Sequence, residues 1–260
     1  MKLNESKTAR RHKKIISLLH KERKVKVTSL SAELNVTEET IRRDLESLEN
    51  ENMLIRVRGG AISKQPMGSE TPLLEREKNN LVEKQALANE ALQIIEEGEI
   101  IAIDASTTSL QLARVLPNFP LTVITNSIHV AVELSQKEQI KVILSGGYLR
   151  TESMSLVGVS SDKIINDYHI DKYFISCTGI HHDWGVSDSH ELQGQTKGRI
   201  AELSEKIIVL ADHSKFNHRS LLRWLMIDQI HTLITSDIVE DDTLNLYKQS
   251  IKHVRVTKGN

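Results

Sequence analysis

The chain has 260 residues, enough for one or two domains, and its 39% hydrophobic and 27% charged content is that of an ordinary soluble protein. Its low aromatic content of 3% argues against recognition of single-stranded nucleic acid by base stacking. The single cysteine, Cys177, excludes an internal disulfide and a multi-cysteine zinc site, and favours a reducing, cytoplasmic location. No apolar run approaches the roughly 18 residues of a membrane helix, so neither membrane insertion nor export is expected.

The net charge of −1 hides an asymmetry along the chain. Residues 1–64 contain 15 Lys and Arg against 9 Asp and Glu, which leaves 19 against 26 for the rest. A basic head on an acidic body suggests a polyanionic partner for the head, although chance surface composition would give the same asymmetry.

The basic head begins with three predicted helices and a short strand. Apolar residues at helical spacing predict a first helix over Lys7–Lys21, and Val25–Val27 alternates like a strand. Thr28 is expected to cap a second helix, and Thr37 a third one over residues 38–51. Two helices joined by a tight turn, the second rich in polar and cationic residues, are typical of a helix-turn-helix.

A β-wing is predicted directly after the third helix. Leu54–Arg58 alternates, Gly59–Gly60 supplies a turn, and the wing so formed is expected to pair with Val25–Val27. The wing favours DNA binding over the alternative, a generic three-helix bundle with a solvated basic face. The predicted contacts to double-stranded DNA come from the third helix and the wing: Thr37, Thr40, Arg42, Arg43, Ser47, Arg56 and Arg58.

The body is predicted to be an α/β domain with a mostly parallel sheet flanked by helices. Residues 1–62 form the winged helix-turn-helix domain, the proline-containing residues 63–80 a linker, and residues 81–260 the α/β domain. Short continuous apolar runs, typical of strands buried on both faces, mark its strands. They lie at Ile100–Ile103, Leu121–Ile124, Val142–Leu144, Tyr173–Ile175, Ile207–Leu210 and Leu233–Ile234.

Small polar residues follow nearly every predicted strand. The carboxyl ends of parallel strands share one edge of the sheet, where ligands bind, and hydroxyls, helix-start amides and a lysine suit a phosphate group. Each segment alone is typical of an ordinary helix cap, so the prediction depends on their convergence. The predicted effector-binding residues are Asp104, Ser106, Thr107, Thr108, Thr125, Asn126, Gly146, Gly147, Gly179, Asp212 and Lys215.

Other chemistries find less support in the sequence. Asp104, Asp212 and Lys215 could transfer protons, but a carboxylate that binds a sugar hydroxyl would look the same. His181–Asp183 lacks the spacing of a metal motif, and neither a dinucleotide fingerprint nor a Walker A motif is present. We therefore expect no cofactor, no metal and no enzymatic activity.

These residues resemble those of the DeoR family of bacterial transcriptional regulators. Thr40–Leu45, with the sequence TIRRDL, and Gly59–Ala61 after Arg56 are similar to the DNA-binding domain of that family. The body is similar to its effector domain, which is related to sugar-phosphate isomerases. The resemblance implies repression that is relieved by a phosphorylated sugar or polyol. The stretches that carry the similarity of the body are Asp104–Thr108, Thr125–Ser127, Gly146–Gly147, Ser155–Gly158 and Asp212–Phe216.

Three positions depart from the family pattern. Ser106 stands where the family usually has glycine, and Arg58 where it usually has a wing histidine. Gln193–Lys197 lacks the acidic residues common there, which bears on which sugar is accepted.

Two further hypotheses remain beside a ligand-sensing regulator of a sugar or polyol operon. One is a sugar-phosphate isomerase or transferase with an appended DNA-binding domain, and the other is an architectural protein whose body only oligomerises. The helix-turn-helix argues against the first, and the polar strand ends argue against the second. Reading a palindrome implies at least a homodimer, and a homotetramer is also compatible.

Overall fold

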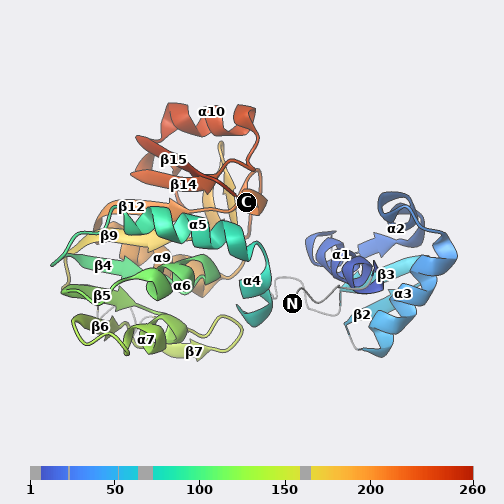
Figure 1. The fold of residues 1–260 in the computed structure, drawn as a ribbon, viewed down its shortest axis with the longest axis horizontal. Helices are drawn as coiled ribbons and strands as arrows, with labels where there is room; N and C mark the ends of the chain where they lie inside the picture. Colours follow the sequence, from blue (N-terminus) through green and yellow to red (C-terminus); the bar gives the residue numbers. More distant parts are fainter. Residues whose placement is uncertain (1–6, 23, 52, 64–72, 159–164, 260) are drawn as a thin grey trace. The chain divides into compact units, whose positions relative to one another are not determined.

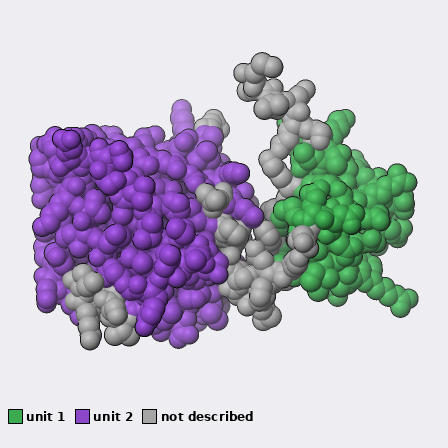
Figure 2. All heavy atoms as spheres, turned by 90° about the horizontal axis from the view of Figure 1, so that it is seen from below, with its two compact units in different colours: residues 1–69 green, residues 70–260 purple. Residues whose placement is uncertain are grey.

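The computed structural model describes residues 7–22, 24–51, 53–63, 73–158 and 165–259. They belong to two compact units, an N-terminal unit (residues 1–69) and a C-terminal unit (residues 70–260), coloured separately in Figure 2. None of the described helices is long and apolar enough to cross a membrane.

The N-terminal unit is a helix-turn-helix closed by a three-stranded antiparallel sheet (Figure 1). Its core joins Ile15 and Leu19 of the first helix to Ile41, Leu45 and Leu48 of the third, all of them buried. The elements are α1 (Lys7–Glu22), β1 (Lys24–Lys26), α2 (Val27–Leu34), α3 (Glu38–Asn50), β2 (Leu54–Val57) and β3 (Gly60–Ser63).

One local prediction for this unit is wrong. Thr28 does not cap α2, because the helix already begins at Val27, whose side chain is buried and whose N–H donates to the carbonyl of Gly59 at 2.9 Å. The wing pairs with β1 as predicted, and it does so through β3, which lies between β1 and β2. Gly60 explains the order: a Cβ there would lie 1.9 Å from the carbonyl oxygen of Val25, so only glycine lets β3 approach β1. Thr37 does cap α3 and accepts the N–H of Thr40 at 3.2 Å.

The C-terminal unit is built on a seven-stranded sheet in the order β15-β14-β12-β9-β4-β5-β6, in which every pairing is parallel. The strands are β4 (Ile100–Ile103), β5 (Leu121–Thr125), β6 (Ile140–Leu144), β9 (Ile170–Ile175), β12 (Ser204–Leu210), β14 (Thr232–Ser236) and β15 (His253–Thr257). Two smaller antiparallel sheets join β7 (Tyr148–Arg150) to β8 (Ser155–Val157), and β10 (Gly179–His181), β11 (Gly185–Asp188) and β13 (Leu222–Leu225).

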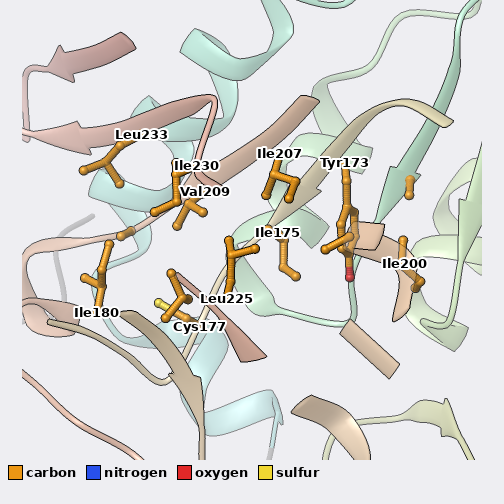
Figure 3. Close-up of a cluster of buried hydrophobic side chains, with 14 of the residues drawn as sticks. Tyr173, Ile175, Cys177, Ile180, Ile200, Ile207, Val209, Leu225, Ile230 and Leu233 are labelled. Atoms are coloured by element: carbon orange, nitrogen blue, oxygen red, sulfur yellow. The ribbon is translucent and has the colours of Figure 1, made fainter. Parts of the chain in front are cut away.

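Helices cover both faces of the sheet. Tyr173 and Ile175 of β9 belong to the cluster on one face (Figure 3), whereas Phe174 between them belongs to the cluster on the other. The second face packs against α5, α6 and α7, and the first against α9 and α10. The helices are α4 (Leu73–Lys78), α5 (Leu81–Leu92), α6 (Thr107–Val115), α7 (Ile128–Leu134), α9 (Glu191–Glu202) and α10 (Asp241–Ser250), with the short turns η1 (His213–Lys215) and η2 (Ile227–Gln229).

The second half of the predicted linker is folded. Leu73–Lys78 forms α4, which belongs to the C-terminal unit, and the buried Leu73 donates its N–H to the carbonyl of Glu152 at 2.9 Å. A helix of six residues with one buried leucine is too short to show the helical periodicity of apolar residues by which it could be predicted. The prolines of the predicted linker, Pro66 and Pro72, lie outside the described residues.

The strand order reverses beside β4. From there the chain moves outward through β5 and β6, and it later returns to the other side of β4 and continues through β9, β12, β14 and β15. Such a reversal leaves a crevice at the carboxyl ends of the two strands that flank it, here β4 and β9.

Candidate functional site

The first candidate surface is the exposed side of α3 and the wing. Arg42 and Arg43 have side chains that are 53% and 77% exposed, and each guanidinium contacts a glutamate one turn earlier, Glu38 at 2.8 Å and Glu39 at 3.3 Å. These ion pairs are solvent-exposed, so they hold the arginines only weakly and leave them available to a polyanion. Arg56 and Arg58 are exposed on the wing.

The remaining predicted DNA contacts have local partners. The hydroxyls of Thr37 and Thr40 lie 2.9 Å apart at the start of α3, and Ser47 donates to the carboxylate of Glu51 at 3.2 Å. Helices of this kind enter the major groove with their N-terminal residues. The structure therefore brings Thr37, Thr40 and the two arginines of α3 to the end of the helix that would meet DNA.

Asp44, inside the TIRRDL stretch, has a structural role. Its carboxylate is buried and accepts two hydrogen bonds from the guanidinium of Arg11, one of them at 2.8 Å, while His12 lies 3.2 Å away. This ion pair fastens α1 to α3. It joins residues more than thirty positions apart, a relation that no local pattern reveals.

The second candidate site is a cleft in the C-terminal unit. It lies at the carboxyl ends of β4, β9 and β12, beside the reversal of strand order. Five predicted effector-binding residues line it, together with several that the sequence analysis did not select. The lining residues are Arg76, Asn79, Asn80, Lys84, Ser106, Thr107, Thr108, Ser176, Cys177, Asp212, Ser214 and Lys215.

One wall of the cleft is the start of α6. Ser106 caps this helix by accepting the N–H of Ser109 at 3.0 Å, and its own hydroxyl donates to Asp104 at 2.7 Å. Thr107 and Thr108 are the first two residues of the helix, where backbone N–H groups lack partners within the helix and attract anions. Ser106 thus shapes the turn, and the two threonines offer the groups that suit an oxyanion.

Cations line the opposite wall of the cleft. The ammonium of Lys84, on the buried stripe of α5, donates to the carbonyl of Arg76 at 2.6 Å. Burial lowers the pKa of Lys84 to about 8, because the attraction of Asp212 and Glu77 is opposed by repulsion from Lys215 and Arg76. A buried lysine whose charge is only partly compensated is a candidate for binding an anion.

Asp212 is the acidic member of the cleft. Its Oδ1 accepts from Asn80 at 3.0 Å and from the N–H and hydroxyl of Ser214. Burial opposes ionisation, but Lys215, the bond from Ser214 and Lys84 outweigh it, so the pKa of Asp212 lies below its ordinary value. Among the residues that line the cleft, Asp212 is the one carboxylate beside the three cations Arg76, Lys84 and Lys215.

Glu83 holds the Lys215-bearing turn against α5. Its carboxylate, buried, accepts from the N–H and the Nδ1 of His213, both at 2.7 Å. Glu83, Asp212 and His213 offer metal-ligand atoms within 4.8 Å of one another. However, the Nδ1 of His213 and a carboxylate oxygen of Glu83 are already hydrogen-bonded to each other. The positive charges of the neighbouring lysines also disfavour a cation at this place.

Asp104 lies beneath the cleft instead of lining it. It is fully buried and forms an ion pair with Lys197 at 3.0 Å, and Lys197 also pairs with Asp188 at 3.0 Å. The ammonium donates to the carbonyl of Ser176 at 2.7 Å as well. Burial lowers the pKa of Lys197, but the two carboxylates outweigh burial and raise it above its ordinary value. We call Asp104, Lys197 and Asp188 the buried triad.

The other predicted effector residues lie outside the cleft lining. Thr125 donates to the carbonyl of Ile103 at 2.6 Å, and Asn126 to the carbonyl of Leu156 at 3.2 Å, so both shape the turn after β5. Gly146 and Gly147 have φ angles of 69° and 112°, a conformation that favours glycine. Added Cβ atoms at Gly147 and Gly179 would lie 2.6 and 2.5 Å from the carbonyl oxygens of Val157 and His218, so these glycines permit close backbone packing.

The sequence analysis missed the residues contributed by α4 and α5, namely Arg76, Asn79, Asn80 and Lys84. They precede the first strand, so attention to strand ends could not find them. One signal was available: Lys84 shares the apolar stripe of α5 with Leu87, Ala88 and Ala91, where a lysine is out of place.

Comparison with known proteins adds family information to this geometry. Residues 11–67 match the family model of the DeoR-like helix-turn-helix domain, and residues 79–237 match that of the DeoR C terminal sensor domain. An uncharacterized HTH-type transcriptional regulator, YulB of Bacillus subtilis, is 41% identical over 96% of each chain. The HTH-type transcriptional repressor GlcR of the same organism is 33% identical over 94% of each chain. The L-fucose operon activator of Haemophilus influenzae is 31% identical over 92% of this chain and 95% of its own.

Similarity to solved structures is weaker. The full-length sorbitol operon regulator SorC from Klebsiella pneumoniae covers 96% of this chain and 97% of its own, with a TM-score of 0.40 and 11% identity. That degree of similarity carries no functional information by itself.

Proposed function

The chain belongs to the DeoR family of transcriptional regulators, and on that premise we propose that α3 and the wing bind double-stranded operator DNA while the cleft binds a phosphorylated sugar or polyol. The observation that carries the ligand class is the meeting of three cations with the start of α6. Arg76, Lys84 and Lys215 lie in the same cleft as Thr107 and Thr108, and a phosphate group needs both kinds of partner.

The regulatory sign that we propose is repression of a sugar or polyol operon, relieved when the ligand binds. The relatives include both a repressor and an operon activator. A reporter gene behind a promoter that carries the operator distinguishes the two, since loss of a repressor raises expression and loss of an activator lowers it. We also propose that the protein acts in the cytoplasm as a homodimer or homotetramer, because a two-fold symmetric operator matches a symmetric oligomer. Analytical ultracentrifugation of the full chain tests the oligomeric state.

A thermal-shift panel tests the ligand class. Phosphorylated sugars and polyols are compared with their dephosphorylated forms on the full chain. A ligand at about 100 times its dissociation constant adds roughly 2.7 kcal/mol to the free energy of unfolding. For a unit of this size each kcal/mol moves the midpoint by about 2–4 °C, so a shift of several degrees is expected.

Two lysine variants make the panel specific to the cleft. Lys215→Ala removes a charge-assisted contact and should abolish most of the shift, whereas Lys141→Ala, an exposed lysine outside the cleft, should keep it. DNA binding without ligand should survive in both variants. A panel without any response would refute the anion site, and turnover of a stabilising compound would favour the isomerase-like enzyme instead.

A further inference from the structure

One wall of the cleft comes from the part of the chain that leads out of the N-terminal unit. β3 ends at Ser63, and α4, which starts at Leu73, is the first helix of the C-terminal unit. Arg76 of α4, the following Asn79 and Asn80, and Lys84 of α5 all line the cleft. Any ligand in the cleft therefore meets the segment through which the two units are covalently joined.

Several contacts between described residues help to place α4. Glu77 pairs with Arg114 of α6 at 2.6 Å, and the N–H of Leu73 donates to Glu152. Lys84 holds the carbonyl of Arg76 near the end of the helix at 2.6 Å. With only six residues, α4 cannot hold its position by itself, so these contacts decide where it lies.

Two of the groups that hold this segment are also ligand groups. Asn80 has the left-handed φ of 53°, precedes α5, and donates its side-chain amide to Asp212 in the cleft. The ammonium of Lys84 is shared in the same way, since it faces both the carbonyl of Arg76 and the cleft. An anion in the cleft attracts the ammonium and repels Asp212, so it alters both contacts together.

We propose that α4 transmits the occupancy of the cleft to the DNA-binding unit, with Lys84 and Asn80 as the positioning residues that make the place of α4 depend on a bound anion. This inference rests on the proposed function, because it assumes that an anionic ligand of the cleft changes DNA affinity. It adds that α4 is the structural element through which anion binding changes DNA affinity.

The test uses Glu77, a residue of α4 that does not line the cleft, although its charge attracts the ammonium of Lys84 and raises the pKa of that lysine. Glu77→Gln removes the ion pair between α4 and Arg114. Its matched control is Glu133→Gln, since Glu133 faces the same Arg114 at 3.8 Å and belongs to α7 instead of α4. DNA affinity of the full chain is measured by fluorescence anisotropy on an operator selected from a random pool. Titrations are made with and without sodium phosphate, and with the panel compound that gives the largest thermal shift, against chloride of equal ionic strength.

Because Glu77 also attracts the ammonium of Lys84, each probe is used at a concentration that saturates the variant, where Glu77→Gln is still expected to show a thermal shift with both probes. The variant should change the ratio of DNA affinities with and without probe by about 3- to 30-fold relative to wild type. Glu133→Gln should leave that ratio within about 2-fold of wild type, because the expected change depends on α4. In wild type, hydrogen exchange of residues 73–84 should change when phosphate is added.

The outcomes separate the two proposals. The role of α4 is overturned, while the proposed function stands, if the probes change the DNA affinity of wild type and of Glu77→Gln by the same factor. The same holds if Glu77→Gln differs from wild type in that factor no more than Glu133→Gln does. Unchanged hydrogen exchange in residues 73–84 at a saturating probe concentration overturns it too. If the DNA affinity of wild type ignores every stabilising probe, the proposed function fails and this inference fails with it.

Discussion

Lys84 should make anion binding in the cleft depend on pH between about 7 and 9. Its pKa lies near 8 because burial, Lys215 and Arg76 together outweigh the attraction of Asp212 and Glu77. An anion favours the charged ammonium, so binding is strongest where Lys84 is protonated and weakens as the pH rises through its pKa.

The size of the effect follows from that pKa. If a bound anion restores the pKa of Lys84 to its unperturbed value of about 10.4, the affinity falls roughly 10-fold between pH 7 and pH 9, or about 1.4 kcal/mol. The same pKa shift makes the free energy of unfolding depend on pH in the opposite direction. Because the folded pKa lies below the unfolded one, the unfolded chain binds more protons between pH 8 and about 10.4, and the free energy of unfolding contributed by Lys84 rises with pH in that window.

Sulfate is a suitable probe, because its charge stays constant over this range. Thermal-shift titrations at pH 7, 8 and 9 and constant ionic strength should show the loss of affinity in wild type. Lys84→Met should bind sulfate more weakly at every pH and without the pH dependence, whereas Lys141→Met, at an exposed position outside the cleft, should behave like wild type. Affinity that does not change with pH in wild type, or an unchanged profile in Lys84→Met, would refute this assignment.

Three further predictions concern DNA binding, stability and separability. Changing Arg42 and Arg43 together to Ala should cost about 2–5 kcal/mol of specific DNA affinity and flatten its salt dependence in gel-shift titrations, and a folded double variant with normal binding would contradict the role of α3. Lys197→Met should lower the free energy of unfolding in urea by about 3–5 kcal/mol, because it leaves Asp104 and Asp188 buried without their cation. Adding Asp104→Asn and Asp188→Asn should restore most of that loss, and a loss below about 1 kcal/mol in the single variant would show that the buried triad matters little. The C-terminal unit alone should fold cooperatively, keep its stabilisation by sulfate and lose DNA binding, and a fragment that melts without cooperativity would place the domain boundary elsewhere.

The sequence predicted the centre of the fold better than its margins. Each predicted apolar run, such as Ile100–Ile103, lies in a strand of the large sheet, although the edge strand β6 is only partly buried. β15 escaped prediction because it is an edge strand with mostly exposed residues. The smaller sheets escaped because short antiparallel strands such as β10 and β7 carry no continuous apolar run, and their pairing depends on distant partners.

The same logic explains the mixed outcome at the cleft. Strand-end residues line it only beside the reversal of strand order, which is why Thr107 and Lys215 are there. The turns after β5 and β6 lie one and two strands farther along the sheet, so Thr125 and Gly147 are not among the residues that line the cleft, and both lie close to neighbouring backbone. The order of the strands in the sheet depends on pairing between distant parts of the chain, so the residues at each strand end do not reveal it.

Two buried lysines near the cleft differ in how far neighbouring groups compensate their charge. This difference distinguishes a lysine that stabilises the fold from one that is suited to bind a ligand. Lys197 has two carboxylates within 3.0 Å, and their attraction outweighs burial and raises its pKa, so its charge is already satisfied by the fold. Lys84 has only the carbonyl of Arg76 as its hydrogen-bond acceptor among the described residues, and it shares Asp212 with Lys215, so burial prevails and lowers its pKa. Folding alone would favour replacing such an uncompensated buried cation with an apolar side chain. Glu83, the other charged residue among the buried positions of α5, is bonded to His213, whereas the charge of Lys84 is accounted for when an anion completes the site. This makes Lys84 the residue on which the ligand hypothesis depends most directly.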